Sequence, residues 1–192
     1  MPPKSKFSRE DIVEAAFEIA KEEGFSKITA RSVASRLNSS VAPIYVNFET
    51  IEELVQAVVR MVFALSEELL AKQKGQNLFK KIGRASLAFA RDYPVLFREL
   101  ILTPNPYMAS YEETEKVMVE ALKDNSEMKD WTMEERRRLL LKMRIFQLGL
   151  SAMVANGHVP SWLDEQEFEK LLMETGDQIL LVEQIQRKED KK

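Results

Sequence analysis

The chain has 192 residues, of which 45% are hydrophobic and 31% are charged, a composition typical of a folded globular protein rather than a disordered one. Its 28 basic and 31 acidic side chains leave a formal net charge of −3, which excludes a uniformly basic nucleic-acid coat but not a local basic patch. The chain has no cysteine and a single histidine, which excludes disulfides, thiolate metal sites, catalytic thiols and any site that needs two imidazoles.

Capping residues and the helical spacing of apolar residues predict helices along the whole chain, with no strand-like alternation. The predicted helices span residues 9–23, 30–37, 41–47, 50–73, 78–92, 94–102, 108–123, 132–155 and 165–186. Side-chain caps are expected at Ser8, Thr29, Ser40, Thr50, Thr132 and Asp164. Asn38 is expected to adopt the left-handed backbone conformation. The sequence therefore predicts an all-α fold of about nine helices.

Two of the predicted helices, over 30–37 and 41–47, are short, joined by a tight turn and preceded by a longer helix. This arrangement is typical of a helix-turn-helix, here over about 29–48, whose second helix lies in the major groove of DNA. We therefore predict a DNA-binding domain over residues 1–50 and a second helical domain over residues 51–192.

The stretch FSREDIVEAAFEIAKEEGFSKITARSVASRLNSSVAPIYVNFETIEELVQAVV resembles the N-terminal domain of tetracycline-repressor (TetR/AcrR)-type transcriptional regulators. The matching positions are Ala15, Ala16, Gly24, Thr29, Val33, Ala34, Leu37, Ser40, Ile44, Tyr45, Phe48 and Leu54. Residues 93–97 and 149–157 resemble, more loosely, elements of the family's ligand-binding and dimerisation domain. The resemblance implies a repressor that binds a palindromic operator in double-stranded DNA as a homodimer and is released by a small ligand.

The predicted DNA contacts lie in the N-terminal arm and in the helix-turn-helix, at Lys4, Lys6, Thr29, Arg31, Ser40, Val41, Ala42, Pro43, Tyr45 and Asn47. Residues 41–43 present only apolar surface, which suits thymine methyl groups and cannot hydrogen-bond a base edge. Arg31 is the residue able to bind a guanine with two hydrogen bonds. Tyr45 and Asn47 resemble phosphate contacts.

The predicted helix over 132–155 carries apolar residues on two sides, which indicates burial by more than its own domain or a contact between chains. With the last helix it predicts a four-helix dimer contact, as the resemblance implies. The residues assigned to this contact are Leu148, Gly149, Ala152, Ala155, Leu172, Ile179 and Val182.

Aromatic residues and methionines in the C-terminal domain are candidates for the lining of an effector pocket. They are Phe89, Phe97, Tyr111, Met118, Met143 and Phe146, and they favour an apolar or aromatic small-molecule effector. The predicted helix over 50–73 starts beside the recognition helix. It is expected to be the only covalent route from such a pocket to the DNA-reading surface.

Several classes of function lack support in the sequence. His158 lies in a predicted turn, no nucleophile signature accompanies it, and the six glycines are too far apart for a phosphate-binding loop. We therefore predict no enzyme, no catalytic or metal-binding residue and no cofactor. No apolar run approaches the roughly 18 residues of a membrane helix, so the sequence predicts a cytoplasmic protein with no membrane partner.

A helical small-molecule-binding or protein-docking module that no longer binds DNA is the alternative prediction. Residues 1–50 carry seven basic and seven acidic side chains, a net charge of zero. Ile51 stands where the family usually has a phosphate-contacting lysine. Both observations favour the alternative, whereas the basic N-terminal arm, Arg31, Tyr45 and the continuous family pattern favour the regulator.

Overall fold

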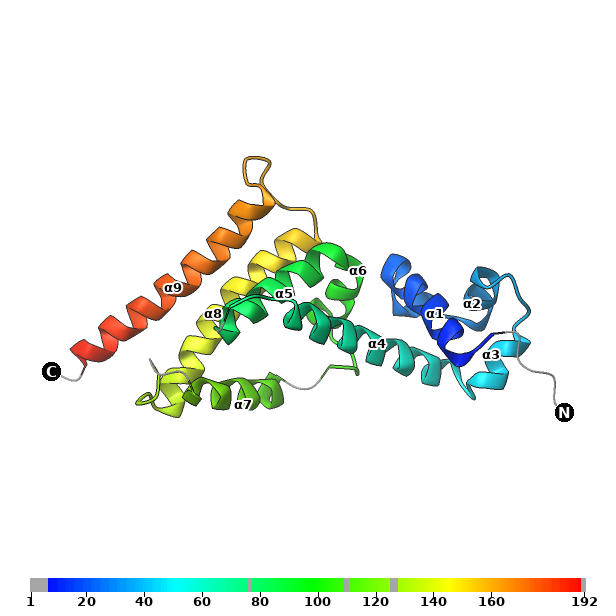
Figure 1. Cartoon of the computed structure of the whole chain (residues 1–192), viewed down its shortest axis with the longest axis horizontal. Helices are drawn as coiled ribbons and strands as arrows, with labels where there is room; N and C mark the ends of the chain where they lie inside the picture. The colour runs from blue at the N-terminus through cyan, green and yellow to red at the C-terminus, as the bar shows by residue number, and fades with distance from the viewer. Residues whose placement is uncertain (1–6, 76, 109–110, 125–127, 191–192) are drawn as a thin grey trace. The chain divides into compact units, whose positions relative to one another are not determined.

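The computed structural model describes residues 7–75, 77–108, 111–124 and 128–190, and no strand occurs within these ranges (Figure 1). The α-helices are α1 (Arg9–Glu23), α2 (Ala30–Arg36), α3 (Ala42–Asn47), α4 (Ile51–Ala71), α5 (Leu78–Asp92), α6 (Pro94–Phe97), α7 (Tyr111–Ala121), α8 (Met133–Ala155) and α9 (Glu165–Glu189). Two short 3₁₀ turns, η1 (Phe25–Lys27) and η3 (Leu122–Asp124), and a π-helical turn, η2 (Arg98–Leu102), complete the regular structure. The predicted all-α fold is confirmed.

Side-chain caps begin most helices at the predicted residues. Ser8, Thr29, Thr132 and Asp164 each accept a hydrogen bond from the amide three residues later, and each is closed into a reciprocal capping box. Thr50 caps α4 by accepting a hydrogen bond from the Glu53 amide. These caps fix where the helices start, because each one satisfies backbone amides that would otherwise lack a partner.

The predicted cap at Ser40 is wrong. Helix α3 starts at Ala42, with Val41 at the N-cap position and no side-chain cap. An N-cap side chain usually accepts from the second or third amide that follows it, and Pro43, three residues after Ser40, has no amide hydrogen. Val41 also has helical backbone angles rather than the extended ones of most N-caps.

Other helix boundaries also differ from the predicted ones, among them the end of α4 at Ala71 rather than at residue 73. Helix α2 ends at Arg36, and Asn38 has the predicted left-handed backbone, with φ of 48°. The helix predicted over 94–102 is α6 followed by the π-helical turn η2. Helix α7 begins at Tyr111 rather than at Met108. Helix α9 continues to Glu189, so the first three residues of the predicted charged tail are helical.

The chain forms two compact units, which we call unit 1 (residues 1–72 and 88–107) and unit 2 (residues 73–87 and 108–192). The chain therefore passes between the units three times, and α4 is not the only covalent connection, contrary to the sequence prediction. Helix α5 itself contributes residues to both units. The division predicted at residue 50 concerns function and stays a prediction.

In unit 1, α1 packs against α2, α4 and α6 around a closely packed apolar core. Its fully buried large side chains are Ile12, Ile19, Val33, Ile44, Phe48, Leu54, Val58, Val62, Leu96 and Phe97. Phe89 and Phe97, both predicted to line an effector pocket, belong to this core instead. The ring of Phe89 lies 5.7 Å from that of Tyr93 and 6.3 Å from that of Phe97, measured between centroids.

In unit 2, α8 packs against both α7 and α9. One cluster of buried residues joins α8 to α7 and to the segment that precedes α8, and consists of Val119, Leu122, Met128, Trp131, Leu139 and Leu140. A second cluster joins α8 to α5 and α9, and consists of Leu87, Leu150, Phe168 and Leu172. Helix α8 therefore has two buried sides, which explains its unusual apolar pattern in the sequence.

Candidate nucleic-acid interface

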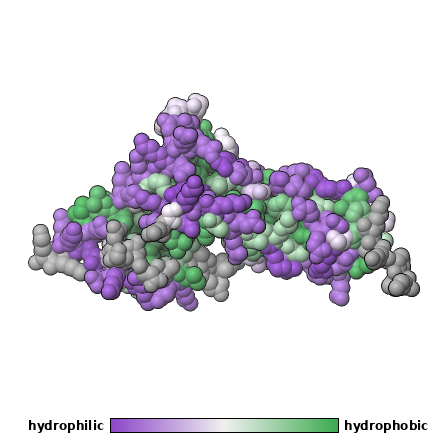
Figure 2. Space-filling model, viewed as in Figure 1, coloured by the Kyte–Doolittle hydropathy of each residue, from purple (hydrophilic) through white to green (hydrophobic). Residues whose placement is uncertain are grey.

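Helices α2 and α3 form the predicted helix-turn-helix, with α3 as the recognition helix (Figure 1). Ile44 is the residue of α3 that is fully buried, and Phe48, directly after the helix, is buried as well. The outward side of α3 consists of Val41, Ala42, Tyr45 and Val46, which we call the reading face. Hydrophobic residues also show at the surface of the part formed by α1–α3 in Figure 2.

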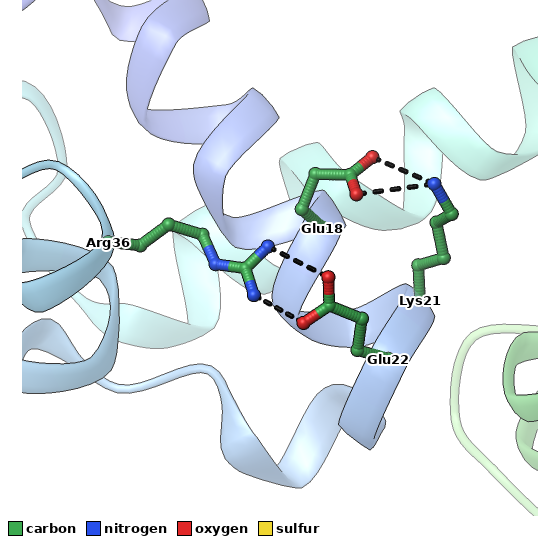
Figure 3. A network of polar contacts seen from close by, with 4 residues as sticks. All are labelled: Glu18, Lys21, Glu22 and Arg36. Atoms are coloured by element: carbon green, nitrogen blue, oxygen red, sulfur yellow. Dashed lines mark hydrogen bonds and ion pairs between the residues drawn. The ribbon is translucent and has the colours of Figure 1, made fainter.

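An ion pair fixes α2 on α1. The Arg36 guanidinium donates two hydrogen bonds to the Glu22 carboxylate, one of them of 3.2 Å, and Lys21 pairs with Glu18 on the adjacent turn (Figure 3). The hydrogen bonds from Arg36 hold the pKa of Glu22 below its usual value. Bidentate pairing restricts the orientation of both side chains and links the C-terminal ends of α1 and α2, which also pack against each other.

Arg9 fixes the corner between α3 and α4. Its guanidinium donates to the Asn47 carbonyl oxygen at 2.5 Å and to a Glu53 carboxylate oxygen at 2.6 Å, and it lies 4.0 Å from the centre of the Phe48 ring. The other Glu53 oxygen accepts the Glu49 amide at 3.0 Å. The hydrogen bond from Arg9, followed by that from the Glu49 amide, lowers the pKa of Glu53. Arg9 therefore positions the recognition helix from within the protein.

The predicted DNA contacts differ in how free their side chains are. Arg31 is exposed, and its guanidinium makes no hydrogen bond or ion pair within the described residues. Tyr45 is 56% exposed. The Thr29 hydroxyl serves the cap of α2, and the Asn47 amide nitrogen donates to the Pro43 carbonyl at 2.8 Å. Ser40 and residues 41–42 are exposed, while Lys4 and Lys6 lie outside the described residues.

A segment distant in sequence packs against the end of α1. The Phe25 amide donates to a Glu99 carboxylate oxygen at 2.7 Å, and the Phe25 and Tyr107 rings lie 5.6 Å apart. Gly24 has φ of +98°, and a Cβ built there would lie 2.2 Å from Glu99 Oε1. A side chain at position 24 would displace this carboxylate and would adopt a backbone conformation that favours glycine. The segment over 88–107 is thus an integral part of the unit that carries the helix-turn-helix.

Unit 2 contains a cavity of about 110 Å³ between α5, α7, α8 and α9. Most of its lining is apolar: Phe79, Ile82, Met118, Met128, Leu140, Met143, Phe146, Leu172, Met173, Ile179 and Leu180. Its polar lining includes Gln147, whose amide donates to the hydroxyls of Ser86 and Ser151, and Lys80, which pairs with Asp177 at 2.8 Å.

Met118, Met143 and Phe146, predicted as effector contacts, all line this cavity. The side chain of Tyr111 lies outside the described residues.

The predicted dimer contacts also divide into two groups. Leu148, Gly149, Ala152 and Val182 are exposed or half-buried on α8 and α9. Ala155 and Leu172 are buried within the chain, and Ile179 lines the cavity. The first group remains available to a second chain, whereas the second is used by unit 2 itself.

The sequence did not predict several contacts that hold the helix-turn-helix in place. The Arg9–Glu53 and Glu22–Arg36 pairs join residues 44 and 14 positions apart, and no local pattern connects them. The contact of Glu99 with Phe25 spans 74 positions. The sequence could have predicted Val46 as a residue of the reading face, because it lies four residues after Ala42 and therefore on the same side of the helix.

Within the described residues, no helix is both long and apolar enough to cross a membrane. The same residues contain no group of three or more histidine, aspartate or glutamate side chains able to hold a metal ion.

Comparisons with known proteins agree with the geometry. Residues 12–58 match the family model of the bacterial regulatory proteins of the tetR family. The fold is similar to that of a TetR-like transcriptional regulator from Rhodococcus sp. RHA1, with a TM-score of 0.61, 17% sequence identity, and coverage of 85% of this chain and 91% of that one. No curated protein matches the chain.

The family match covers most of α1, all of α2 and α3 and the first part of α4, which is the region that holds the Glu22–Arg36 pair and the reading face, while Arg9 lies just before it. Regulators of this family are non-enzymatic transcription factors, in line with the expectation that the chain is not an enzyme. We conclude that residues 12–58 form a DNA-binding domain similar to that of the tetR family, within a chain whose all-α fold is that of a TetR-like regulator, and both findings support a DNA-binding regulator.

Proposed function

We propose that this regulator is a repressor that binds a palindromic operator as a homodimer and is released from it by a small molecule in the cavity of unit 2. The observation that carries the proposal is the apolar cavity, which belongs to the same chain as the helix-turn-helix. A ligand that favours one arrangement of the helices around the cavity changes the DNA affinity by linkage. Because bacterial DNA lies in the cytoplasm, the proposal includes a cytoplasmic location.

The size of the cavity indicates the size of the effector. Ligand sites commonly occupy about 300–1,000 Å³, whereas an apolar cavity of about 150 Å³ holds a benzene molecule. The volume of about 110 Å³ is smaller than that, so a group the size of one aromatic ring fits only if the cavity widens. Four methionines line the cavity, at 118, 128, 143 and 173, and their flexible side chains allow it to expand.

Support for the homodimer comes from the outward sides of α8 and α9. On α8, the exposed Leu141 and Ile145 continue along the helix into Leu148, Gly149 and Ala152. On α9, Leu181, Val182 and Ile185 are exposed. Apolar residues at this spacing on two helices match the requirements of a four-helix contact about a two-fold axis.

The test of DNA binding is selection of duplex DNA from a random library by the purified full-length chain. We expect selected sites with two inverted half-sites about one helical turn apart, bound with an affinity that falls as salt rises. Recovery of no duplex above background would overturn the proposal and favour the alternative, a module that docks on other molecules without binding DNA.

The test of the effector site uses toluene and indole as probes, with thermal unfolding and operator release as measurements. Both probes are expected to raise the unfolding temperature and to weaken operator binding. Met143→Trp fills the cavity and is expected to abolish both effects, whereas Met143→Leu keeps its volume and serves as the control. Equal responses of the two variants would contradict the assignment of the cavity.

A further inference from the structure

The reading face of α3 is unusually apolar for a surface that must meet DNA. Val41 is 38% exposed and Val46 is 74% exposed, and Ala42 lies exposed between them along the chain. These residues and Tyr45 lie at positions i, i+1, i+4 and i+5, which places them on one side of the helix. None of the three aliphatic side chains can donate or accept a hydrogen bond.

The polar side chain of α3 other than Tyr45, that of Asn47, is half-buried and bonds its own helix. Its amide nitrogen donates to the Pro43 carbonyl, while the backbone carbonyl of Asn47 accepts from Arg9. The phenol of Tyr45 places its hydroxyl far from the helix axis, where it suits a phosphate oxygen rather than a base edge. Hydrogen-bonded reading of bases from the centre of α3 therefore lacks side chains to perform it.

The major groove offers one apolar feature, the C5-methyl group of thymine. A helix-turn-helix places its second helix in that groove, so the reading face meets base edges directly. We infer that Val41, Ala42 and Val46 recognise thymine methyl groups, and that the operator half-site is a thymine-containing sequence selected mainly by these contacts. The inference rests on the proposed operator binding and names the DNA chemistry that the same site prefers.

One hydrogen-bonded base is expected beside the thymines. Among the arginines of α1 to α3, Arg9 is held by Glu53 and Asn47, and Arg36 is held by Glu22. Arg31, at the second position of α2, is exposed and makes no hydrogen bond or ion pair in the described part of the chain. Its guanidinium is therefore available for a guanine at the edge of the half-site.

The charge of the domain points in the same direction. Residues 1–50 have a net charge of zero, so the electrostatic attraction that drives sequence-independent binding is weak. Specific affinity must then depend more on contacts with bases. The salt dependence of operator binding is expected to be shallower than for a strongly basic helix-turn-helix domain.

Replacement of thymine by deoxyuridine tests the inference, because it removes the methyl group and keeps every hydrogen-bonding atom of the base. With a selected operator and the full-length chain, each contacted thymine replaced in this way is expected to weaken binding about fourfold. Replacement of thymines between or outside the half-sites serves as the control and is expected to change nothing.

A protein variant connects the effect to the reading face. Val46→Ala is expected to weaken binding to the thymine operator and to make one deoxyuridine position neutral, since the side chain that contacted the methyl group is shortened. Val46 is largely exposed, so the variant keeps its fold, which circular dichroism checks.

Selected half-sites without thymine, or deoxyuridine operators bound as tightly as the parent, would overturn the inference and leave the proposed function intact. Recovery of no duplex at all would overturn the proposed function, and the inference with it.

Discussion

The two units use their surfaces and interiors differently, and their glycines show the difference most clearly. A Cβ at Gly24 in unit 1 would lie 2.2 Å from Glu99 Oε1, whereas a Cβ at Gly149 in unit 2 meets nothing within 4 Å. In unit 1, side chains from distant segments bind backbone atoms at helix ends, as Arg9 binds the Asn47 carbonyl and Glu99 binds the Phe25 amide. Unit 2 instead contains a cavity and an open apolar side on α8.

This difference matches the two tasks that we propose for the chain, DNA binding by unit 1 and binding of an effector and a second chain by unit 2. A surface that reads DNA needs its helices fixed to a fraction of an ångström, and contacts with backbone atoms at helix ends provide that. A part that receives a ligand or a second chain needs empty volume and exposed apolar surface before that partner arrives. Under this proposal, unit 1 needs no further contact to fix its helices, whereas the cavity and the apolar side of α8 in unit 2 are filled only when an effector and a second chain bind.

The largest effect is expected from Gly149→Arg, which tests whether the open side of α8 receives a second chain. The arginine fits the single chain without strain, since nothing lies within 4 Å of the added Cβ. In a dimer contact it buries an unpaired charge, which costs about 3–5 kcal/mol and weakens association at least a hundredfold. Analytical ultracentrifugation measures this effect, with Gly149→Ala as the small-residue control. An unchanged dimer for the arginine variant would show that this side of α8 stays open to solvent.

The next largest effect tests whether the contact between Glu99 and the Phe25 amide stabilises unit 1. Gly24→Ala forces a side chain into a backbone conformation that favours glycine and displaces Glu99 from the Phe25 amide, for a total cost of about 2–4 kcal/mol. Gly75→Ala is the matched control, because Gly75 also has φ of +98° but no atom within 4 Å of the added Cβ. Urea unfolding of the two variants measures the difference. Equal losses would mean that the Glu99 contact contributes nothing.

Prediction from the sequence succeeded where the signal is local. Capping residues such as Ser8 and Thr132 identified helix starts to the residue, because a cap acts within three positions of itself. The cap at Ser40 failed since Pro43 removes the amide that the cap needs. Val41 and Tyr45 were predicted on the reading face, which the structure leaves exposed.

Contacts that join distant segments could not be predicted. Phe89 and Phe97 are aromatic, as the residues that line a ligand pocket often are, but the fold places them in the core of unit 1. Leu172 lies at a helical spacing that also fits a dimer contact, but it packs inside unit 2. Apolar side chains at helical spacing specify burial without specifying the partner, so a single sequence does not separate core, cavity and interface.

A smaller effect is expected at Arg31, and it tests whether this exposed arginine of α2 contacts a base. Arg31→Ala is expected to weaken operator binding by about 1–3 kcal/mol and to relax the preference at one base pair. Arg60→Ala removes the same charge from an exposed position on α4 and serves as the control. Fluorescence anisotropy with operator and single-base variants measures both effects. Equal weakening on all duplexes would make Arg31 a phosphate contact.

The smallest effect concerns pH. Within the described residues, Asp11, Glu22 and Glu53 of unit 1 have lowered pKa values, caused mainly by the Ser8 amide, Arg36 and Arg9 respectively. A carboxyl group whose pKa is lower in the folded chain adds stability above its ordinary pKa, and this stability is lost as the pH falls through the folded value. Unit 1 is therefore expected to lose stability below a pH of about 4.5, close to the ordinary pKa of a glutamate.

Hydrogen exchange of the amides in α1 to α3, corrected for intrinsic rates, measures this loss without interference from unit 2. The double variant Glu22→Gln and Glu53→Gln cannot change charge at these positions, so its exchange is expected to be faster at pH 6 and to depend less on pH. Glu52→Gln, an exposed neighbour on α4, controls for the removal of a negative charge. If the double variant keeps the full pH dependence, the two ion pairs do not stabilise the helix-turn-helix. The close packing of the apolar core then accounts for the stability of unit 1.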